Sequence, residues 1–360
     1  MPGVGARANP FLAADQLYAN PALADNWREL ATHAATSDLE SIQKADGTAV
    51  SLSSLAQRLE RLMAVPSAFW IDSKSKIRDP GGSPDTLEGI LAFAASMAAM
   101  NGGRAPLCTF VWYDLPNRDC HAKASSGEIC CGGRLPGGRC DLSSQAGDCA
   151  AGLHEYETEY VEPFIEVLSR YADRVPIVII VEPDSLPNLI TNDADPHCGA
   201  ATFAGYTKGV GYAVRRLSEA VPSVSVYLDA GHGGWLGWDD DARDYMKMVC
   251  DLGIMSVLRG FSTNVANYDP TGTVGCPDAA FTPGENVGHF CNWVAKDHPC
   301  CRADPCALVP QYNSGPTEVV FAQTLRKHAG EQCAGATPHM VIDTARNGND
   351  GARASDCRAW

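Results

Sequence analysis

Several features are missing from this sequence, and each absence narrows what the protein can be. No run of about 18 apolar residues is present, so no segment is expected to span a membrane. The N-terminal residues MPGVGAR lack the apolar core of a signal peptide, and no N-x-[ST] sequon marks a site of N-glycosylation. No linker, repeat or low-complexity segment divides the 360 residues, which predicts one domain.

Motifs for metals, nucleotides and nucleophilic serines are missing too. No CxxC pair occurs, and His232 has no second His or Cys at a suitable spacing, so no metal site is expected. Residues 81–84 lack the closing Gly of GxSxG and have no strand before them. Residues 205–211 contain glycines without the order of a dinucleotide loop. The protein is therefore expected to work without a cofactor.

Positive charge is scarce. The chain has 28 Lys and Arg against 43 Asp and Glu, which gives a net charge of −15. A nucleic acid or an anionic membrane surface is therefore an unfavourable partner, whereas a neutral ligand is not repelled. With 45% apolar and only 20% charged residues, the chain is expected to bury a large core.

Cysteine, by contrast, is abundant: fifteen are present. The adjacent pairs Cys130-Cys131 and Cys300-Cys301 lie among Gly, Pro and Asp, which favours disulfides formed in an oxidising compartment over zinc. Residues 129–140 have no periodicity and are expected to form a disulfide-tied loop. The odd total means that at least one thiol is free or that its partner is missing from this chain.

The segment from Val175 to Val181 is apolar, β-branched and too short for a helix, which predicts a strand buried on both faces. Pro183 ends this strand and leaves Asp184 at its carboxyl end, where parallel sheets place their chemistry. A carboxyl group there is poorly solvated and suited to donate a proton. The alternative is that Asp184 caps a helix that begins at the following residues.

A second stretch repeats this arrangement. Residues 107–113 predict another strand, and Asp114 and Asp119 follow it, with Pro116 closing the strand. Two strand ends that each carry an Asp suggest paired carboxylates that act across one bond. Further strands are expected at 68–72, 224–228, 256–261 and 339–343, alternating with helices at 52–63, 86–100, 155–171, 203–219 and 317–328. Six strands alternating with helices predict a parallel sheet, most simply closed as a β/α barrel.

Four motifs in order give this chain a family resemblance: YDLPNRDC (113–120), VEPDSLPNL (181–189), YLDAGHGGWLGW (227–238) and RGFSTNVANY (259–268). Together they resemble glycoside hydrolase family 6, the cellobiohydrolases and endoglucanases that cut β-1,4-glucan with inversion. The resemblance runs from residue 9 to the last residue. It implies an α/β fold, a distorted seven-stranded parallel (β/α) barrel, and a cellulose or cello-oligosaccharide substrate.

The resemblance also implies roles for individual residues. Asp184 would be the proton donor, and Asp119 would keep the pKa of Asp184 high and relay a proton. Tyr113 would lie beneath the reacting sugar; without the motif it is an ordinary aromatic residue of a strand. Two indoles in a Gly-rich loop are unlikely core residues, and Trp235 and Trp238 would stack on glucose. The remaining glucan contacts would come from His232, Asp229, Asn267, Ser125, Tyr18, Asn20 and Trp360.

Structural roles follow from the same resemblance. A disulfide from Cys120 to Cys198 would tie the two catalytic loops together, and Arg118 would hold the Asp119 loop through a salt bridge. Tyr18 has a second interpretation, as a packed residue of an arm that lies on the barrel.

The resemblance breaks near the C-terminus. Residues 1–360 are interpreted as a single catalytic domain that is incomplete there, because the family's last strand, its catalytic-base Asp and a nearby Lys and Glu have no counterpart. Arg346 would lose its partner, that Asp. We expect a secreted monomer whose activity as written is low; exo and endo action stay open. The alternative is a glucan-binding pseudoenzyme that has lost hydrolysis together with the base.

Overall fold

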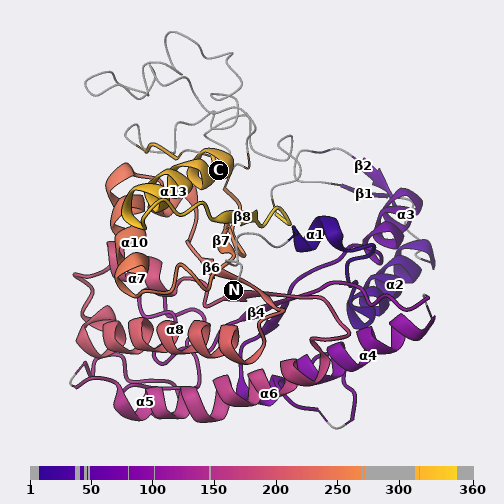
Figure 1. Cartoon of the computed structure of the whole chain (residues 1–360). Helices are drawn as coiled ribbons and strands as arrows, with labels where there is room; N and C mark the ends of the chain where they lie inside the picture. Colours follow the sequence, from indigo (N-terminus) through magenta and orange to yellow (C-terminus); the bar gives the residue numbers. More distant parts are fainter. Residues whose placement is uncertain are drawn as a thin grey trace.

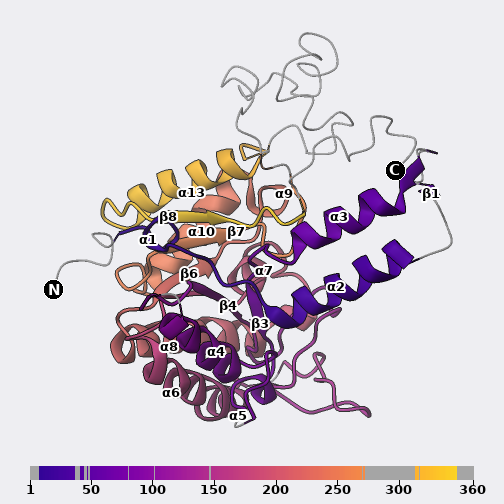
Figure 2. The same ribbon diagram turned by 90° about the vertical axis from the view of Figure 1, so that its right-hand side faces the viewer.

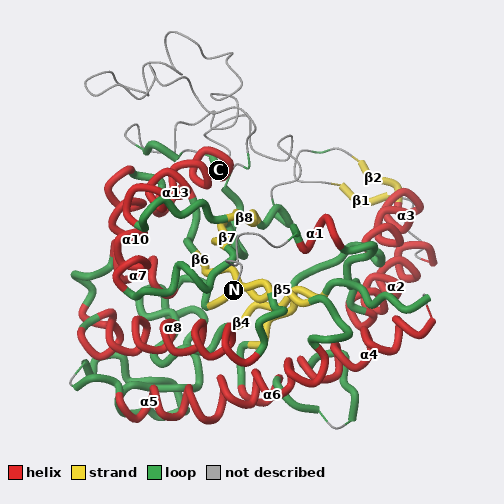
Figure 3. Tube along the Cα trace, viewed as in Figure 1, coloured by secondary structure: helices red, strands yellow, loops and turns green. Residues whose placement is uncertain are grey.

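The computed structural model describes residues 8–36, 41–43, 47, 49–79, 81–100, 102–145, 147–269, 271, 313–315 and 317–346. Its centre is a sheet of six parallel strands, drawn in yellow in Figure 3. Each strand pairs with the next one in the sequence, as successive β/α units produce. The strands are β3 (Phe69–Ile71), β4 (Cys108–Trp112), β5 (Ile177–Val181), β6 (Ser225–Asp229), β7 (Gly260–Thr263) and β8 (His339–Ile342).

Helices cover the outside of this sheet (Figure 1), so β5 and β6 are buried along their whole length. Alternate residues of β4 point outward: the Trp112 ring stacks on Phe164 with centroids 4.2 Å apart. The covering helices are α4 (Leu87–Met100), α5 (Ala150–Glu155), α6 (Glu162–Tyr171), α7 (Ser185–Thr191), α8 (Ala200–Ala220), α10 (Asp239–Asp251) and α13 (Glu318–Gln332).

The inner face of the sheet surrounds a cavity of about 540 Å³. Side chains from β3, β4, β5, β7 and β8 all line it, so the sheet curves into a barrel. The two edge strands, β3 and β8, do not pair with each other within the described residues, and the barrel is open between them. Phe11 of helix α1 (Pro10–Ala13) packs against the cluster of Leu107, Val178 and Tyr227. It thereby covers the barrel at the amino ends of the strands.

A separate arm precedes the barrel. Helices α2 (Pro21–Thr36) and α3 (Leu52–Leu62) pack side by side and project from it, as Figure 2 shows. Two short antiparallel strands, β1 (Ser41–Gln43) and β2 (Ala49–Ser51), join them. Helix α3 was predicted from its spacing, whereas α2 and the β1–β2 pair were not.

The predicted parallel α/β architecture is confirmed, and the parallel sheet has six strands within the described residues. The fifth strand was placed too early, at 256–261. It begins at Gly260, where an added Cβ would lie 1.7 Å from the carbonyl oxygen of His339, so only Gly permits the close pairing with β8. The helix expected at 155–171 begins at Ala150 and contains a π-helical turn, η3 (Tyr156–Val161).

Four disulfides cross-link the described part of the chain. Cys120 pairs with Cys198, as expected, and Cys250 pairs with Cys333. The adjacent cysteines 130 and 131 pair with 140 and 149, which confirms the disulfide-tied loop. The Cys300-Cys301 pair lies outside the described residues. Within the described segments, no helix has both the length and the apolar character needed to cross a bilayer.

Candidate active site

The carboxyl ends of β4 and β5 bring the two predicted carboxylates to one place. Trp112 and Val181 are partners in the parallel register, so the residues that follow them leave the sheet side by side. The negative charge of Asp119 is one of the causes that raise the pKa of Asp184. Asp119 and Asp184 both have positive φ angles, 59° and 60°, a conformation that L-residues adopt rarely and that is common at active sites.

Asp184 occupies the N-cap position of α7, but its side chain makes no capping hydrogen bond. Asp184 therefore occupies the cap position that the alternative predicts, but its carboxyl group does not cap the helix. Burial, followed by the charge of Asp119, raises the pKa of Asp184 to about 6, against a lowering effect of His232. This carboxyl group keeps its proton in mildly acidic solution, as a proton donor requires.

Asp119 and Tyr113 are the two residues expected to act together with Asp184. The carboxylate of Asp119 accepts a hydrogen bond from the backbone N–H of Ser125 at 2.6 Å. The Tyr113 ring lies between the Arg118 guanidinium, 4.2 Å from the ring centroid, and the edge-on ring of Trp70 at 5.2 Å. Burial and the charge of Asp184 raise the pKa of the Tyr113 hydroxyl, so it stays protonated beside Asp184.

Arg118 holds this loop together through its guanidinium group, as expected. It donates hydrogen bonds to the carbonyl oxygens of Ser125 and Asp72, both at 2.8 Å, and to that of Tyr113. The same guanidinium group lies 3.4 Å from the carboxyl group of Asp114, its expected salt-bridge partner in this loop. Asp114 is fully buried, and burial raises its pKa to about 9, although Arg118 acts in the opposite direction.

Glu182 is a site residue that the sequence did not indicate. Its buried carboxylate accepts hydrogen bonds from the N–H groups of Asp114 and Leu115, at 3.1 and 3.3 Å, and from the Tyr156 hydroxyl at 2.8 Å. Burial raises its pKa to about 7. Glu182 directly follows β5, and it binds the backbone that follows β4. It therefore sets the position of the Asp119 loop relative to Asp184.

Asp229, at the end of β6, supports the same site from the other side. One carboxylate oxygen accepts hydrogen bonds from the backbone N–H groups of Asp184 and Gly231, both at 3.0 Å. Burial, together with the charge of Asp184, raises the pKa of Asp229 well above its ordinary value. The expected contact of Asp229 with sugar stays a prediction. In this structure the side chain of Asp229 holds the backbone of Asp184.

The two tryptophans were expected in a loop after β6, but Trp235 lies in a short helix, α9 (Gly233–Leu236), and Trp238 is at the N-cap of α10. Trp235 and Trp238 are half-buried, and the Trp235 indole N–H donates to the Thr191 hydroxyl at 2.6 Å. The α9 segment is held from beneath by residues far along the chain. Glu318 accepts from the N–H of Gly233 at 2.7 Å, and Asn313 donates to the carbonyl oxygen of the same glycine at 2.6 Å. Sequence motifs gave no sign of this support.

The other predicted contacts lie at varied depths. Ser125 and Arg346 are exposed and Asn267 is half-buried, whereas Asn20 is buried and caps α2.

Tyr18 is also buried and packs edge-on against Phe93, as its packed interpretation describes, while its ring lines the barrel cavity. Trp70, which no sequence motif indicated, lines that cavity too and touches Tyr113. Trp360 lies outside the described residues.

The Cys120–Cys198 disulfide joins the loop of Asp119 to the segment after α7. Polar contacts reinforce the same junction: Asp195 hydrogen-bonds to His121 and to His197, each at 2.8 Å. Within the described residues no group of three or more His, Cys, Asp or Glu side chains is arranged to hold a metal ion.

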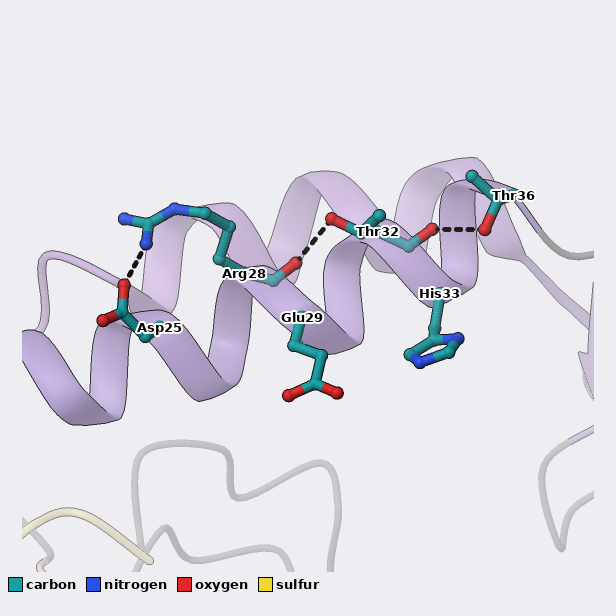
Figure 4. A pocket seen from close by; sticks show the side chains of 6 residues that line it. All are labelled: Asp25, Arg28, Glu29, Thr32, His33 and Thr36. Atoms are coloured by element: carbon teal, nitrogen blue, oxygen red, sulfur yellow. Dashed lines mark hydrogen bonds and ion pairs between the residues drawn. The ribbon is translucent and has the colours of Figure 1, made fainter.

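Helix α2 carries a separate hollow that is lined by charged and polar side chains (Figure 4). All six lining residues come from this single helix, and the contacts drawn join residues three or four positions apart. The Arg28–Asp25 ion pair has both side chains more than 60% exposed. Such a surface is the solvated face of a helix, and it brings no catalytic groups together. It is lined by Asp25, Arg28, Glu29, Thr32, His33 and Thr36.

Comparison with known proteins identifies the family. The chain is 35% identical over 303 residues to 1,4-beta-D-glucan cellobiohydrolase C of Emericella nidulans, which covers 83% of this chain and 56% of the relative. The chain thus spans little more than half the length of that relative. Its fold is similar to the catalytic domain of Cellulomonas fimi Cel6B, with a TM-score of 0.71, 27% identity, and coverage of 94% of this chain and 66% of the other.

A second solved structure is the CcCel6A catalytic domain in complex with p-nitrophenyl beta-D-cellotrioside. It has a TM-score of 0.65 and 28% identity, and the match covers 96% of this chain and 75% of that one. The model of the glycosyl hydrolases family 6 matches residues 15–360. The chain therefore belongs to glycosyl hydrolases family 6.

Proposed function

We propose that this protein hydrolyses β-1,4-glucosidic bonds of cellulose and cello-oligosaccharides with inversion at the anomeric carbon. Asp184 protonates the leaving oxygen, and Asp119 keeps that proton in place and relays it. Tyr113 supports the reacting sugar from below. The observation that carries the proposal is the pairing of Asp119 and Asp184 at adjacent strand ends, with the pKa of Asp184 raised to about 6.

The substrate class is supported by the relatives. The Emericella protein is named a cellobiohydrolase, and the CcCel6A structure contains a cellotrioside derivative. The exposed parts of Trp235 and Trp238 supply flat apolar faces of the kind that pack on the C–H faces of glucose. Release of cellobiose from chain ends is favoured over internal cleavage, because the name of the relative describes that action.

The remaining features of the proposal are a secreted location and a monomeric state. Four disulfides within the described residues suit an oxidising compartment outside the cytosol. A neutral glucan chain is not repelled by the net charge of −15.

The decisive experiment measures cleavage of cellohexaose by residues 1–360, with the anomeric form of the product followed by NMR. We expect the α-anomer to form first, and Asp184→Asn to lower kcat by 10²- to 10⁴-fold, the usual contribution of a general acid. Inversion also needs a base on the opposite face of the sugar. Glucan binding without any cleavage would instead support the pseudoenzyme.

A further inference from the structure

Asp269 lies six residues after Thr263, the last residue of β7, on the loop next to the one that carries His232. One of its carboxylate oxygens contacts Nδ1 of His232 and accepts a hydrogen bond from the N–H of Gly234 at 2.7 Å. A Cβ at Gly234 would lie 2.7 Å from the same oxygen, so the glycine makes this approach possible. The carboxylate thus binds both the side chain of His232 and the backbone two residues later.

This contact fixes the chemical state of the imidazole. An ionised carboxylate only accepts hydrogen bonds, so Nδ1 of His232 must carry a proton. No described residue forms a hydrogen bond with Nε2, and the side chain is 20% exposed. Among the described residues, the ring is therefore bound at one nitrogen, Nδ1, by Asp269.

The His232 loop is joined to the backbone of Asp184, because one oxygen of Asp229 accepts hydrogen bonds from the N–H groups of both Asp184 and Gly231. Three carboxyl groups act electrostatically on His232: Asp269 from the β7 loop, Glu318 from α13 and Asp184 after β5. Burial alone would lower the pKa of His232, but the hydrogen bond and charge of Asp269, followed by the other two charges, raise it. The imidazolium in turn lowers the pKa of Asp184.

We propose that Asp269 is a positioning residue for the reaction: it binds Nδ1 of His232 and the N–H of Gly234, and so orients the imidazole on the loop whose backbone Asp229 joins to that of Asp184. The inference rests on the proposed function in one respect, because Asp184 must be the proton donor. In this proposal the β7 loop determines the highest pH at which Asp184 still holds its proton.

The test compares the pH profile of kcat/KM for the wild type, Asp269→Asn, His232→Asn and the double variant. Without the carboxylate, His232 loses its charge near neutral pH, so the proton of Asp184 is held more strongly. The alkaline limb of the profile should move to higher pH by about half a unit, and the double variant should match His232→Asn. Asp239→Asn is the control, because it alters a distant Asp–His pair at His328. The alkaline limb of its kcat/KM profile should stay at the wild-type pH.

NMR titration of the His232 imidazole in the wild type and in Asp269→Asn separates the two possible failures. A lower pKa of His232 in the variant supports the inference even if no hydrolysis is detected, in which case it is the proposed function that fails. An unchanged pKa of His232 overturns the inference whatever the activity. A loss of kcat/KM by the same factor at every pH overturns it too, because a purely structural role would act in that way.

Discussion

The candidate site has two halves that are built differently. The half at the ends of β4 and β5, with Asp119 and Asp184, is fixed by buried groups from neighbouring strands: Glu182, Arg118 and a disulfide. The half that carries Trp235 and Trp238 follows β6 and is held by Glu318 and Asn313, about 80 residues later in the chain. The proposed chemistry thus lies on the half that buried groups and a disulfide fix, and substrate binding is expected from the half that Glu318 and Asn313 support.

The disulfides offer the largest test of this difference. Cys120–Cys198 closes 78 residues beside the carboxylates, and Cys250–Cys333 closes 83 residues between α10 and α13. Loops of this length predict a loss of about 4 kcal/mol in the free energy of unfolding when either pair is replaced by serine. Only the Cys120/Cys198 variant should also lower kcat. Equal effects of both variants on kcat would show that the two halves are not distinct.

Replacing Glu182 should produce the next largest effect. Glu182→Ala leaves two backbone N–H groups and the Tyr156 hydroxyl without their acceptor in the core, which predicts a loss of about 3 kcal/mol in denaturant unfolding. Glu166→Ala is the matched control, because that carboxylate and its partner Arg78 are half exposed and their ion pair is worth at most about 1 kcal/mol. Similar losses in both variants would contradict the role of Glu182.

The pH dependence of stability should differ between the halves. The pKa of Asp114 rises from 3.8 to about 9 on folding, so the folded protein holds a proton that the unfolded chain releases above pH 3.8. Its contribution is therefore complete below pH 3.8 and is lost as pH rises through about 9. The corresponding window for Glu318 is narrower, from 4.5 to about 7.

Thermal unfolding between pH 5 and pH 9 would measure this contrast. Asp114→Asn should flatten the decline in stability over the whole range, because an amide stays neutral. Glu318→Gln should flatten it only below about pH 7. Curves parallel to the wild type in Asp114→Asn would argue against a protonated carboxyl group at that position.

The smallest effect is expected in the tryptophan half. Trp235→Ala should raise KM for cellohexaose about tenfold, which corresponds to ~1.4 kcal/mol, a typical value for one aromatic contact. The change in kcat should be small. Trp27→Ala, on the α2 arm, is the control and should leave KM unchanged. A reduced kcat with unchanged KM in Trp235→Ala would place the indole in the chemical step.

Sequence patterns located the main elements but placed some boundaries badly. The β-branched run before Pro183 predicted β5 correctly, because a buried parallel strand needs only its own composition to be recognised. Helix α4 was expected to begin at residue 86, but it begins at Leu87, and the Thr86 hydroxyl accepts from the N–H of Gly89 at 3.1 Å. Several polar residues in succession could have capped that helix, and the path of the chain decided among them.

The sequence by itself determined that Asp119 and Asp184 stand at the ends of parallel strands, because a short apolar run followed by Pro fixes where a strand stops. It also determined the disulfide-rich character of the loops. Only the tertiary structure decided that Glu182 joins the two loops, that Glu318 supports the tryptophans and that Asp269 holds His232. These contacts connect residues 26 to 85 positions apart. No local pattern encodes such pairs, since they depend on which strand ends the barrel brings together.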